Sequence, residues 1–440
     1  MKSSLNLRRP DPCRAGAARV ALVVLCAGAN AACQDSGGGA KGSTTLWSPA
    51  GYEQIPLGIP RDLDPDPNRI EVVIESRPAQ IALRAGGPEI TMWTYDGLIP
   101  GPLIRAKRGD KLTVRFRNSL PDSSTIHWHG VRVPNPMDGS HVTQAHVSPG
   151  GEFVYAFDLV DAGTFWYHPH HQSNKQVGFG LYGPLVVDAR DEPPGLGSPA
   201  IIVLSDVTLD ASGKLAPYDE GGIEAGKRGR EGSIVLVNGR TRPTVTVPIN
   251  SRQRWLLVNA SRNRFFRIAL QGHALTRIGG DGGFLEQPLA DLPDLMLGPG
   301  ERGDVVFIPT GTPGARILVS LLPYDRGNGS GDAMADAVAL MDLSLAPPSD
   351  SNAVPPALPA QLRSIERLAP TLDSPVDELA IGETPTGFVV NGQAFNGDMR
   401  LPAKVGELRV FDLINHTIYD HPFHLHGFFF QVLAPNTFTP

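Results

Sequence analysis

The sequence predicts an all-β chain made of tandem Greek-key β-sandwiches, the third of which is incomplete. Glycine and proline are abundant, 49 and 41 of 440 residues, and runs of strong helix formers are scarce. Short apolar runs alternate with turn residues, as in chains of many short strands. A hydrophobic content of 41% and a charged content of 19% are typical of a soluble protein with sizeable cores. The net charge of −6, without a basic stripe, argues against a nucleic-acid partner.

The strand-rich stretches divide the chain into more than one domain, as its length requires. Turn-bounded apolar runs fill the first stretch, and a proline-rich linker separates the second from the third. The predicted units are a first sandwich over 69–190, a second over 199–345, the linker over 346–362 and a partial third sandwich over 363–440.

The N-terminal segment predicts export. Residues 1–33 carry Arg8, Arg9 and Arg14, then an apolar run that ends in small residues, and residues 34–68 form a tether and lead-in. All three cysteines, Cys13, Cys26 and Cys33, lie in this segment. Cys33 stands where a bacterial lipoprotein would carry its lipid, and the sequence leaves that lipid anchor and simple secretion both open. We expect a periplasmic or cell-envelope protein.

Eight of the twelve histidines lie in three short groups, and each group has an H-x-H core. The groups are His127-Trp128-His129-Gly130, His168-Pro169-His170-His171 and His421-Pro422-Phe423-His424-Leu425-His426-Gly427. Side chains two apart on an extended strand point the same way, so each pair presents both imidazoles to one face. Six imidazoles are too many for one zinc ion, and they suit a multinuclear centre in a cleft between two domains.

The other six histidines are interpreted as lying outside this centre. His421 has the opposite parity to His424, so on an extended segment it faces away and serves a different site. His273 and His416 are interpreted as ordinary histidines without a metal. The same interpretation is given to a further set that lies near the groups: His141, His146 and His171.

These motifs resemble those of the multicopper oxidases, the laccase-like enzymes with three cupredoxin-like domains, from about Arg69 onward. The first copper motif is matched by Ile99-Pro100-Gly101-Pro102, Arg108-Gly109-Asp110 and Ile126-His127-Trp128-His129-Gly130. The second is matched by Gly163-Thr164-Phe165-Trp166-Tyr167-His168-Pro169-His170, and the third by His421 to Gly427. Non-liganding landmarks are Gly280-Asp281-Gly282-Gly283 and Pro299-Gly300-Glu301-Arg302-Gly303-Asp304.

The resemblance implies a copper enzyme that takes single electrons from a small reducing substrate and reduces O2 to water. By position, the type 2 copper would be held by His127 and His424, and one type 1 ligand would be His421. The type 3 pair would be held by His129, His168, His170 and His426. Asp138, in Met137-Asp138-Gly139, stands where the family has an acid that assists proton delivery; a simple turn aspartate is the alternative.

One departure from the family is large. Its fourth motif, a His-Cys-His that supplies the type 1 thiolate, has no counterpart, and no cysteine follows Cys33. We therefore expect a C-terminally truncated family member, with open strand edges in its third sandwich, that is inactive as written. The alternative is a non-catalytic exported copper-binding or scaffold protein. The seven methionines are scattered, which favours an organic donor such as a phenol over a metal ion without excluding the latter.

Overall fold

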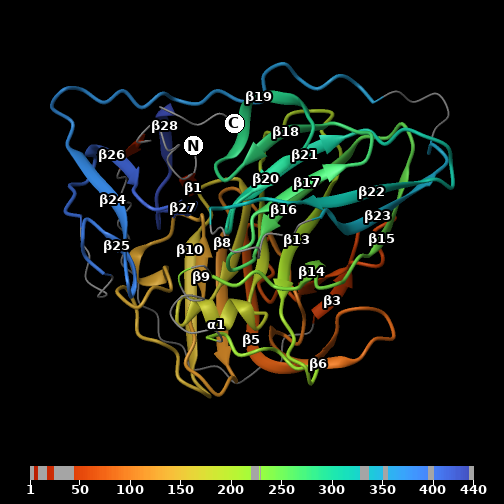
Figure 1. Cartoon of the computed structure of the whole chain (residues 1–440), viewed down its shortest axis with the longest axis horizontal. Helices are drawn as coiled ribbons and strands as arrows, with labels where there is room; N and C mark the ends of the chain where they lie inside the picture. Colours follow the sequence, from red (N-terminus) through yellow and green to blue (C-terminus); the bar gives the residue numbers. More distant parts are fainter. Residues whose placement is uncertain are drawn as a thin grey trace.

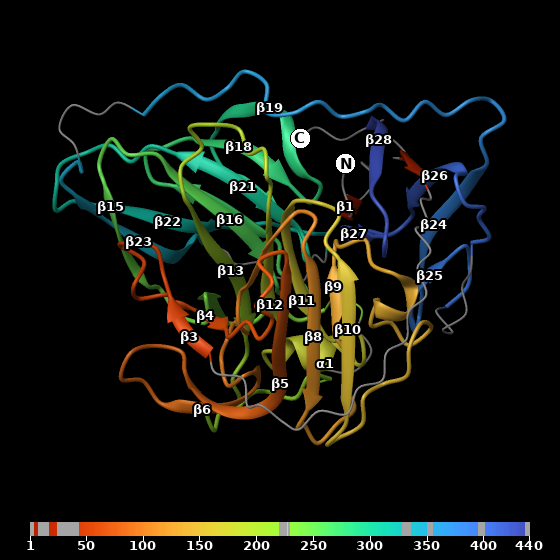
Figure 2. The same ribbon diagram turned by 180° about the vertical axis from the view of Figure 1, so that it is seen from behind.

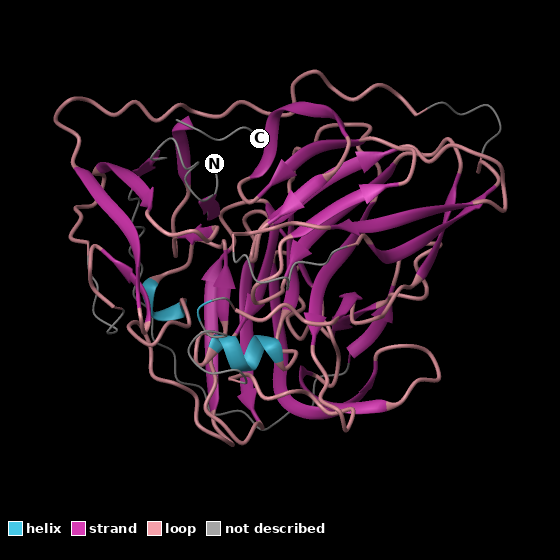
Figure 3. Cartoon of the chain, viewed as in Figure 1, coloured by secondary structure: helices cyan, strands magenta, loops and turns pink. Residues whose placement is uncertain are grey.

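The computed structural model describes residues 4–7, 17–23, 44–219, 227, 229–327, 336–349, 355–394 and 401–435. Strands and loops make up nearly all of this part, so the prediction of an all-β chain is confirmed (Figure 3). The short helix α1 (Ser173–Gly178) and the 3-10 turn η1 (Asn135–Met137) lie between strands. Among the described residues, no helix is long and apolar enough to span a bilayer.

The first sandwich packs two four-stranded sheets, ordered β10-β8-β5-β6 and β7-β12-β11-β9. Alternate residues of β8, including Leu112, Val114 and Phe116, are buried between the sheets, as a two-faced strand requires. The strands are β5 (Arg69–Ala82), β6 (Glu89–Tyr95), β7 (Ile104–Lys107), β8 (Lys111–Asn118), β9 (His127–His129), β10 (Glu152–Asp158), β11 (Gly163–His168) and β12 (Gly183–Asp188).

The second sandwich contains a six-stranded sheet, β14-β13-β16-β21-β18-β19, and a five-stranded sheet, β15-β23-β22-β17-β20. Its core surrounds the fully buried Trp255 and Phe266. The first sheet contains β13 (Pro199–Val207), β14 (Ile234–Val237), β16 (Gln253–Asn259), β18 (Leu275–Gly280), β19 (Gly283–Leu292) and β21 (Arg302–Phe307). The second sheet contains β15 (Thr244–Pro248), β17 (Phe266–Leu270), β20 (Leu295–Leu297), β22 (Arg316–Leu322) and β23 (Val338–Ala346).

A shared apolar layer fixes the second sandwich against the first. Trp166 and Val186 of the first sandwich pack with Ile201, Val203 and Leu256 of the second in one buried cluster. The hairpin of β3 (Thr44–Trp47) and β4 (Leu57–Pro60) extends this cluster through Leu57. The first two sandwiches therefore form one packed body, which Figure 2 shows from behind.

The third group of strands is drawn in blue in Figure 1, and the segment that leads to it from β23 crosses the top of the view. Its sheet has the order β25-β24-β26-β2-β28, and β1 pairs with β27. The strands from this part of the chain are β24 (Val376–Thr384), β25 (Gly387–Val390), β26 (Leu408–Asn415), β27 (His421–His424) and β28 (Phe430–Pro435).

Two N-terminal strands pair where open edges were expected in this third group. Strand β2 (Ala17–Val23) runs antiparallel to both β26 and β28, and β1 (Ser4–Leu7) runs antiparallel to β27. The expectation of open edges is therefore wrong for these strands, because an edge's unpaired N–H and C=O groups accept any strand that can reach them. Part of the apolar run assigned to export lies in β2, whereas Cys13, Cys26 and Cys33 lie outside the described residues.

Candidate metal centre

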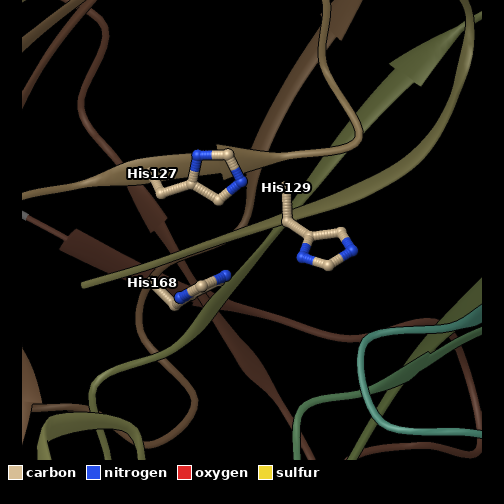
Figure 4. A group of neighbouring side chains, drawn as sticks. All are labelled: His127, His129 and His168. Carbon is tan, nitrogen blue, oxygen red and sulfur yellow. The ribbon is translucent and has the colours of Figure 1, made fainter. Parts of the chain in front are cut away.

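The three histidine groups meet at one end of the first sandwich. Strands β9 and β11 are antiparallel neighbours, and His127 lies directly opposite His168 in their register. Figure 4 shows the rings of His127, His129 and His168 side by side on these strands. The third group reaches them through β27, which ends at His424 and continues to His426 in the following turn. Residues almost 300 positions apart thus share one site.

His127 lies at the middle of the six rings. Its centroid is 4.0 Å from that of His426 and 5.2 Å from that of His168. On the other side, His129 and His424 stack in parallel with centroids 3.9 Å apart. Two sets of ring nitrogens each lie within 4.8 Å of one another: His127, His129 and His168 in one set, and His127, His424 and His426 in the other. Since both sets contain His127, they form one continuous cluster.

Hydrogen bonds orient three of these rings. The Nδ1 atom of His127 is 2.8 Å from the carbonyl oxygen of Asp138, and that of His168 is 3.0 Å from the carbonyl oxygen of Pro169. A carbonyl oxygen only accepts, so both Nδ1 atoms carry the proton and donate it. The Nδ1 atom of His426 likewise donates to Asp138 Oδ2 over 2.8 Å. All three rings therefore present an Nε2 lone pair, the form in which imidazole binds a metal.

Unpartnered nitrogens show that the residues fit a metal. Nε2 of His129, Nε2 of His168 and Nδ1 of His170 are buried without a hydrogen-bond partner. The Nε2 atoms of His127 and His424 face each other across 3.4 Å. Leaving several buried polar atoms unsatisfied is costly, and ligation by shared cations removes that cost for all of them together.

The site also keeps its imidazoles neutral. Burial, followed by the charge of neighbouring rings, holds the pKa of His129 and His168 well below the usual 6.5. The same causes lower the pKa of His170 to about 3. A metal ligand must be unprotonated, so these rings are ready to bind across the physiological pH range.

Asp138 links the two halves of the cluster. Its carboxylate accepts from His426, and its Oδ1 lies 3.4 Å from His127 Nδ1. Burial by itself would raise the Asp138 pKa, but the hydrogen bonds and positive character of these two rings outweigh burial and lower it. Gly139 has a φ of +82°, and a Cβ there would lie 2.1 Å from the carbonyl oxygen of Ile126. The turn can therefore bring Asp138 against β9 only with glycine at this position.

Three supporting residues were not assigned a role by the sequence. The ring of Trp166 stacks on His168 with centroids 4.1 Å apart and lies 4.9 Å from His129. Gly300 lies so close that a Cβ would approach His129 Cε1 to 2.8 Å. Arg302, fully buried, donates to the carbonyl oxygens of Thr164 and Gly300 and pairs with Asp281. Trp166, Gly300 and Arg302 all stand in the quoted motifs, but the contacts of Trp166 depend on strand pairing within the first sandwich, and those of Gly300 and Arg302 on packing between sandwiches.

A cavity of about 910 Å³ opens beside the cluster. Imidazoles form one wall, while Ser261, Arg262 and Asn263 of the second sandwich lie on another. The imidazoles that line it are His129, His168, His170, His424 and His426. Small molecules could therefore reach the ring nitrogens from this side.

His421 lies apart from the cluster. Its Nε2 is 2.7 Å from Thr417 Oγ1, and Phe388 packs edge-on against its ring. Burial, and then the charge of Arg326, lowers the His421 pKa to about 4. No cysteine occurs among the described residues beside it. Elsewhere, His273 is half-buried and bonded to Thr310, and His416 is exposed.

Three segments match family models described as multicopper oxidase, at residues 79–192, 200–320 and 369–439. Together these segments cover more than half of the 440 residues. The chain belongs to the multicopper oxidase family. The laccase-like resemblance seen in the histidine motifs is thereby confirmed, and copper is the cofactor that the family implies.

Relatives of this oxidase occur in several bacteria. Multicopper oxidase MmcO of Mycobacterium tuberculosis is 32% identical over 83% of this chain and 76% of its own length. Copper resistance protein A of Pseudomonas syringae is 43% identical, but over 28% of this chain and 20% of its own. Among solved structures, the Campylobacter jejuni multicopper oxidase, titled a metallo-oxidase, superposes with a TM-score of 0.71 at 25% identity. That match covers 84% of this chain and 82% of the other.

Proposed function

We propose that this chain carries the oxygen-reducing centre of a copper-dependent oxidoreductase that couples one-electron oxidation of a small reducing substrate to the reduction of O2 to water. The observation that supports this most directly is the cluster of six imidazoles, in which two sets of ring nitrogens converge and buried nitrogens of His129, His168 and His170 have no hydrogen-bond partner. Copper held there supplies one-electron redox chemistry, for which imidazole is a suitable ligand.

The ligand roles follow the family pattern. His127 and His424 hold the type 2 copper, which agrees with their facing Nε2 atoms 3.4 Å apart. The type 3 pair is held by His129, His168, His170 and His426. His129, His168 and His170 are supported by their buried, unpartnered ring nitrogens. His426 is supported by the hydrogen bond from its Nδ1 to Asp138, which leaves its Nε2 pointing away from that residue.

Asp138 acts mainly by positioning. Its ionised carboxylate accepts from His426 Nδ1, and its backbone carbonyl accepts from His127 Nδ1, so one residue sets the tautomer of both ligands. Reduction of O2 to water also consumes protons, and a buried carboxylate at this point can pass them from solvent to the cluster. The lowered pKa keeps this carboxylate ionised at neutral pH, the form in which it accepts hydrogen bonds.

The proposal does not include a complete type 1 copper centre. A type 1 centre needs a thiolate, and in the described part of the chain the neighbours of His421 include Thr417 and Phe388 but no cysteine. The chain's three cysteines all precede residue 34. We therefore propose that the 440-residue chain binds copper in the cluster but does not turn over an organic donor, which makes it a copper-binding protein in practice.

Two further elements of the proposal concern substrate and location. The scattered methionines favour phenolic donors, whereas one relative of known structure is described as a metallo-oxidase and another relative is named copper resistance protein A. The arginines and apolar run near the N-terminus favour export to the periplasm or cell envelope, with Cys33 as a candidate lipid anchor.

Copper loading of the purified 440-residue chain tests the proposal. We expect several tightly bound copper ions per chain, no blue thiolate-to-copper absorption band, and no oxygen uptake with a phenolic donor. Failure to retain copper after dialysis would overturn the centre itself. A blue band with sustained oxygen uptake would instead overturn the proposed lack of turnover while leaving the centre intact.

A further inference from the structure

A second group of histidines lies on the outer side of the cluster. The rings of His146 and His171 are in contact, with centroids 4.0 Å apart and planes tilted by 48°. His141 is within electrostatic reach of both rings. His141 and His146 are exposed and His171 is half-buried, so an ion in solution can reach them. None of the three belongs to the two sets of converging nitrogens inside the cluster.

The contact between His146 and His171 is held by a buried framework. Residue 147, which follows His146, forms a two-way backbone bridge with Ser124, with hydrogen bonds of 2.9 and 3.0 Å. Residue 170, which precedes His171, donates its backbone N–H to Thr125 Oγ1 over 3.0 Å. Ser124 and Thr125 are themselves fully buried. Two adjacent, rigid residues thus fix the two loops that carry the exposed rings.

The neighbouring charges permit a cation. Lys175, a positive side chain that acts on His171, is paired with Asp122, and its ammonium lies 5.1 Å from the ring centre of Trp93. The negative charge of Asp122 in turn favours a positive charge at His171. The local balance around the rings is therefore close to neutral before an ion binds.

We propose that His146 and His171, with His141 as a third ligand, form an auxiliary surface site for a divalent transition-metal ion, copper above all. Imidazole nitrogens select such ions over calcium or magnesium, and among the divalent first-row metals copper binds nitrogen ligands most strongly. His141 is the third ligand because it lies on the same loop as His146, which begins two residues after Asp138, and acts electrostatically on both rings.

The position of this site suggests its use. His170 and His171 are consecutive, yet the first points into the cluster and the second contacts His146 outside it. Asp138 and His146 likewise lie at the inner and outer ends of one loop. A copper ion at the surface site would be held next to the interior ligands, so we assign the site to copper capture during loading of the centre.

Equilibrium dialysis against Cu²⁺ tests the site by comparing copper binding of histidine variants with that of the unaltered chain. We expect His146→Ala and His171→Ala each to weaken one class of bound copper by at least the roughly 10-fold loss typical of disturbing a ligand's support. The interior copper should be retained in both variants. His273→Ala, which removes a half-buried histidine of the second sandwich, serves as the matched control and should bind as the unaltered chain does.

The same protein can be tested by crystallography. Crystals of the copper-loaded chain, dialysed before growth to remove loosely bound surface copper and then soaked in Zn²⁺, should show anomalous density at the zinc edge about 2.1 Å from nitrogens of His146 and His171. Unchanged copper binding in His146→Ala and His171→Ala would overturn the proposal, and so would soaked crystals without zinc at these rings. If an alanine variant does not fold, His146→Gln replaces it, and the zinc density decides independently.

Discussion

The first sandwich and the last group of strands supply the two halves of one site, but they hold those halves differently. In the first sandwich, β9 and β11 lie inside a core of 21 buried apolar residues, and His127 and His129 are 1% and 5% exposed. In the described part of the last group, the buried core contains four apolar residues, and the His426 side chain is 29% exposed. The first half is therefore preformed, and the second is docked onto it by weaker packing.

This contrast explains how a multinuclear site can be assembled from distant segments. The first half fixes the geometry, since its imidazoles are held by a rigid sheet and by Trp166, Gly300 and Arg302. The second half adds ligands through β27 and the turn after it, and this part of the chain contacts the first sandwich through imidazoles, Asp138 and Phe429. Bound copper then contributes to docking as well as to redox chemistry, because metal binding energy is shared with folding.

The largest expected effect comes from a matched pair of core substitutions. Phe116→Ala and Phe430→Ala each remove a fully buried ring, at a cost of about 3–5 kcal/mol. We expect Phe116→Ala to unfold the first sandwich and abolish copper binding, whereas Phe430→Ala loosens only the last group. Hydrogen exchange measured by mass spectrometry separates the two. Equal loss of protection in β9 and β11 for both variants would contradict the contrast.

A second pair concerns the ligands. His127→Ala removes the ring common to both sets of nitrogens, whereas His424→Ala leaves the first set complete. We expect copper affinity to fall by more than about 100-fold in His127→Ala, and by less in His424→Ala. Competitive titration with a copper chelator measures both, with His416→Ala as the exposed control. The reverse order would show that the last group, not the first sandwich, determines affinity.

Asp138→Asn should have an intermediate effect. The amide keeps the size of the side chain but removes the charge that anchors His426, and loss of such a supporting group costs about 10–100-fold in metal affinity. The backbone carbonyl still orients His127, so that ligand is retained. Asp158→Asn, an exposed aspartate at the end of β10, is the control. Copper affinity equal to that of the control would show that Asp138 does not support His426 as a ligand.

The smallest expected effect is the dependence of stability on pH. Burial lowers the pKa of His170 to about 3 and that of His421 to about 4, against 6.5 for an unperturbed histidine. Between these values the unfolded metal-free chain binds more protons than the folded one, so stability falls as pH falls from 6.5 toward 4. Each such group contributes at most about 1.4 kcal/mol per pH unit.

Urea unfolding of the metal-free chain at pH 7 and pH 5 measures this dependence. His421→Phe should reduce the slope by the share of one group, because it removes a titrating ring outside the cluster. A free energy of unfolding that is the same at both pH values would show that the buried rings are not held neutral. His416→Ala provides a control, since that residue is exposed.

Much of the site could be predicted from local sequence because its signals are local. The H-x-H spacing on β9 specifies that His127 and His129 share a face without knowledge of the fold, and the spacing from His421 to His424 likewise specifies that His421 turns elsewhere. The all-β class followed from turn and strand patterns for the same reason.

The remaining features depend on contacts between segments far apart in the chain. The support of His129 by Gly300 comes from the second sandwich, and the contact of Asp138 with His426 joins residues 288 positions apart. The pairing of β2 with β26 likewise depends on which backbone edges lie within reach, not on a motif in either strand. No local periodicity carries this information.

Anomalous diffraction at the copper edge from crystals of the copper-loaded 440-residue chain tests the central claim most directly. We predict copper among the nitrogens of His127, His129, His168, His170, His424 and His426, and none at His421. Copper bound by the first-sandwich histidines alone, with His424 and His426 turned away, would contradict it.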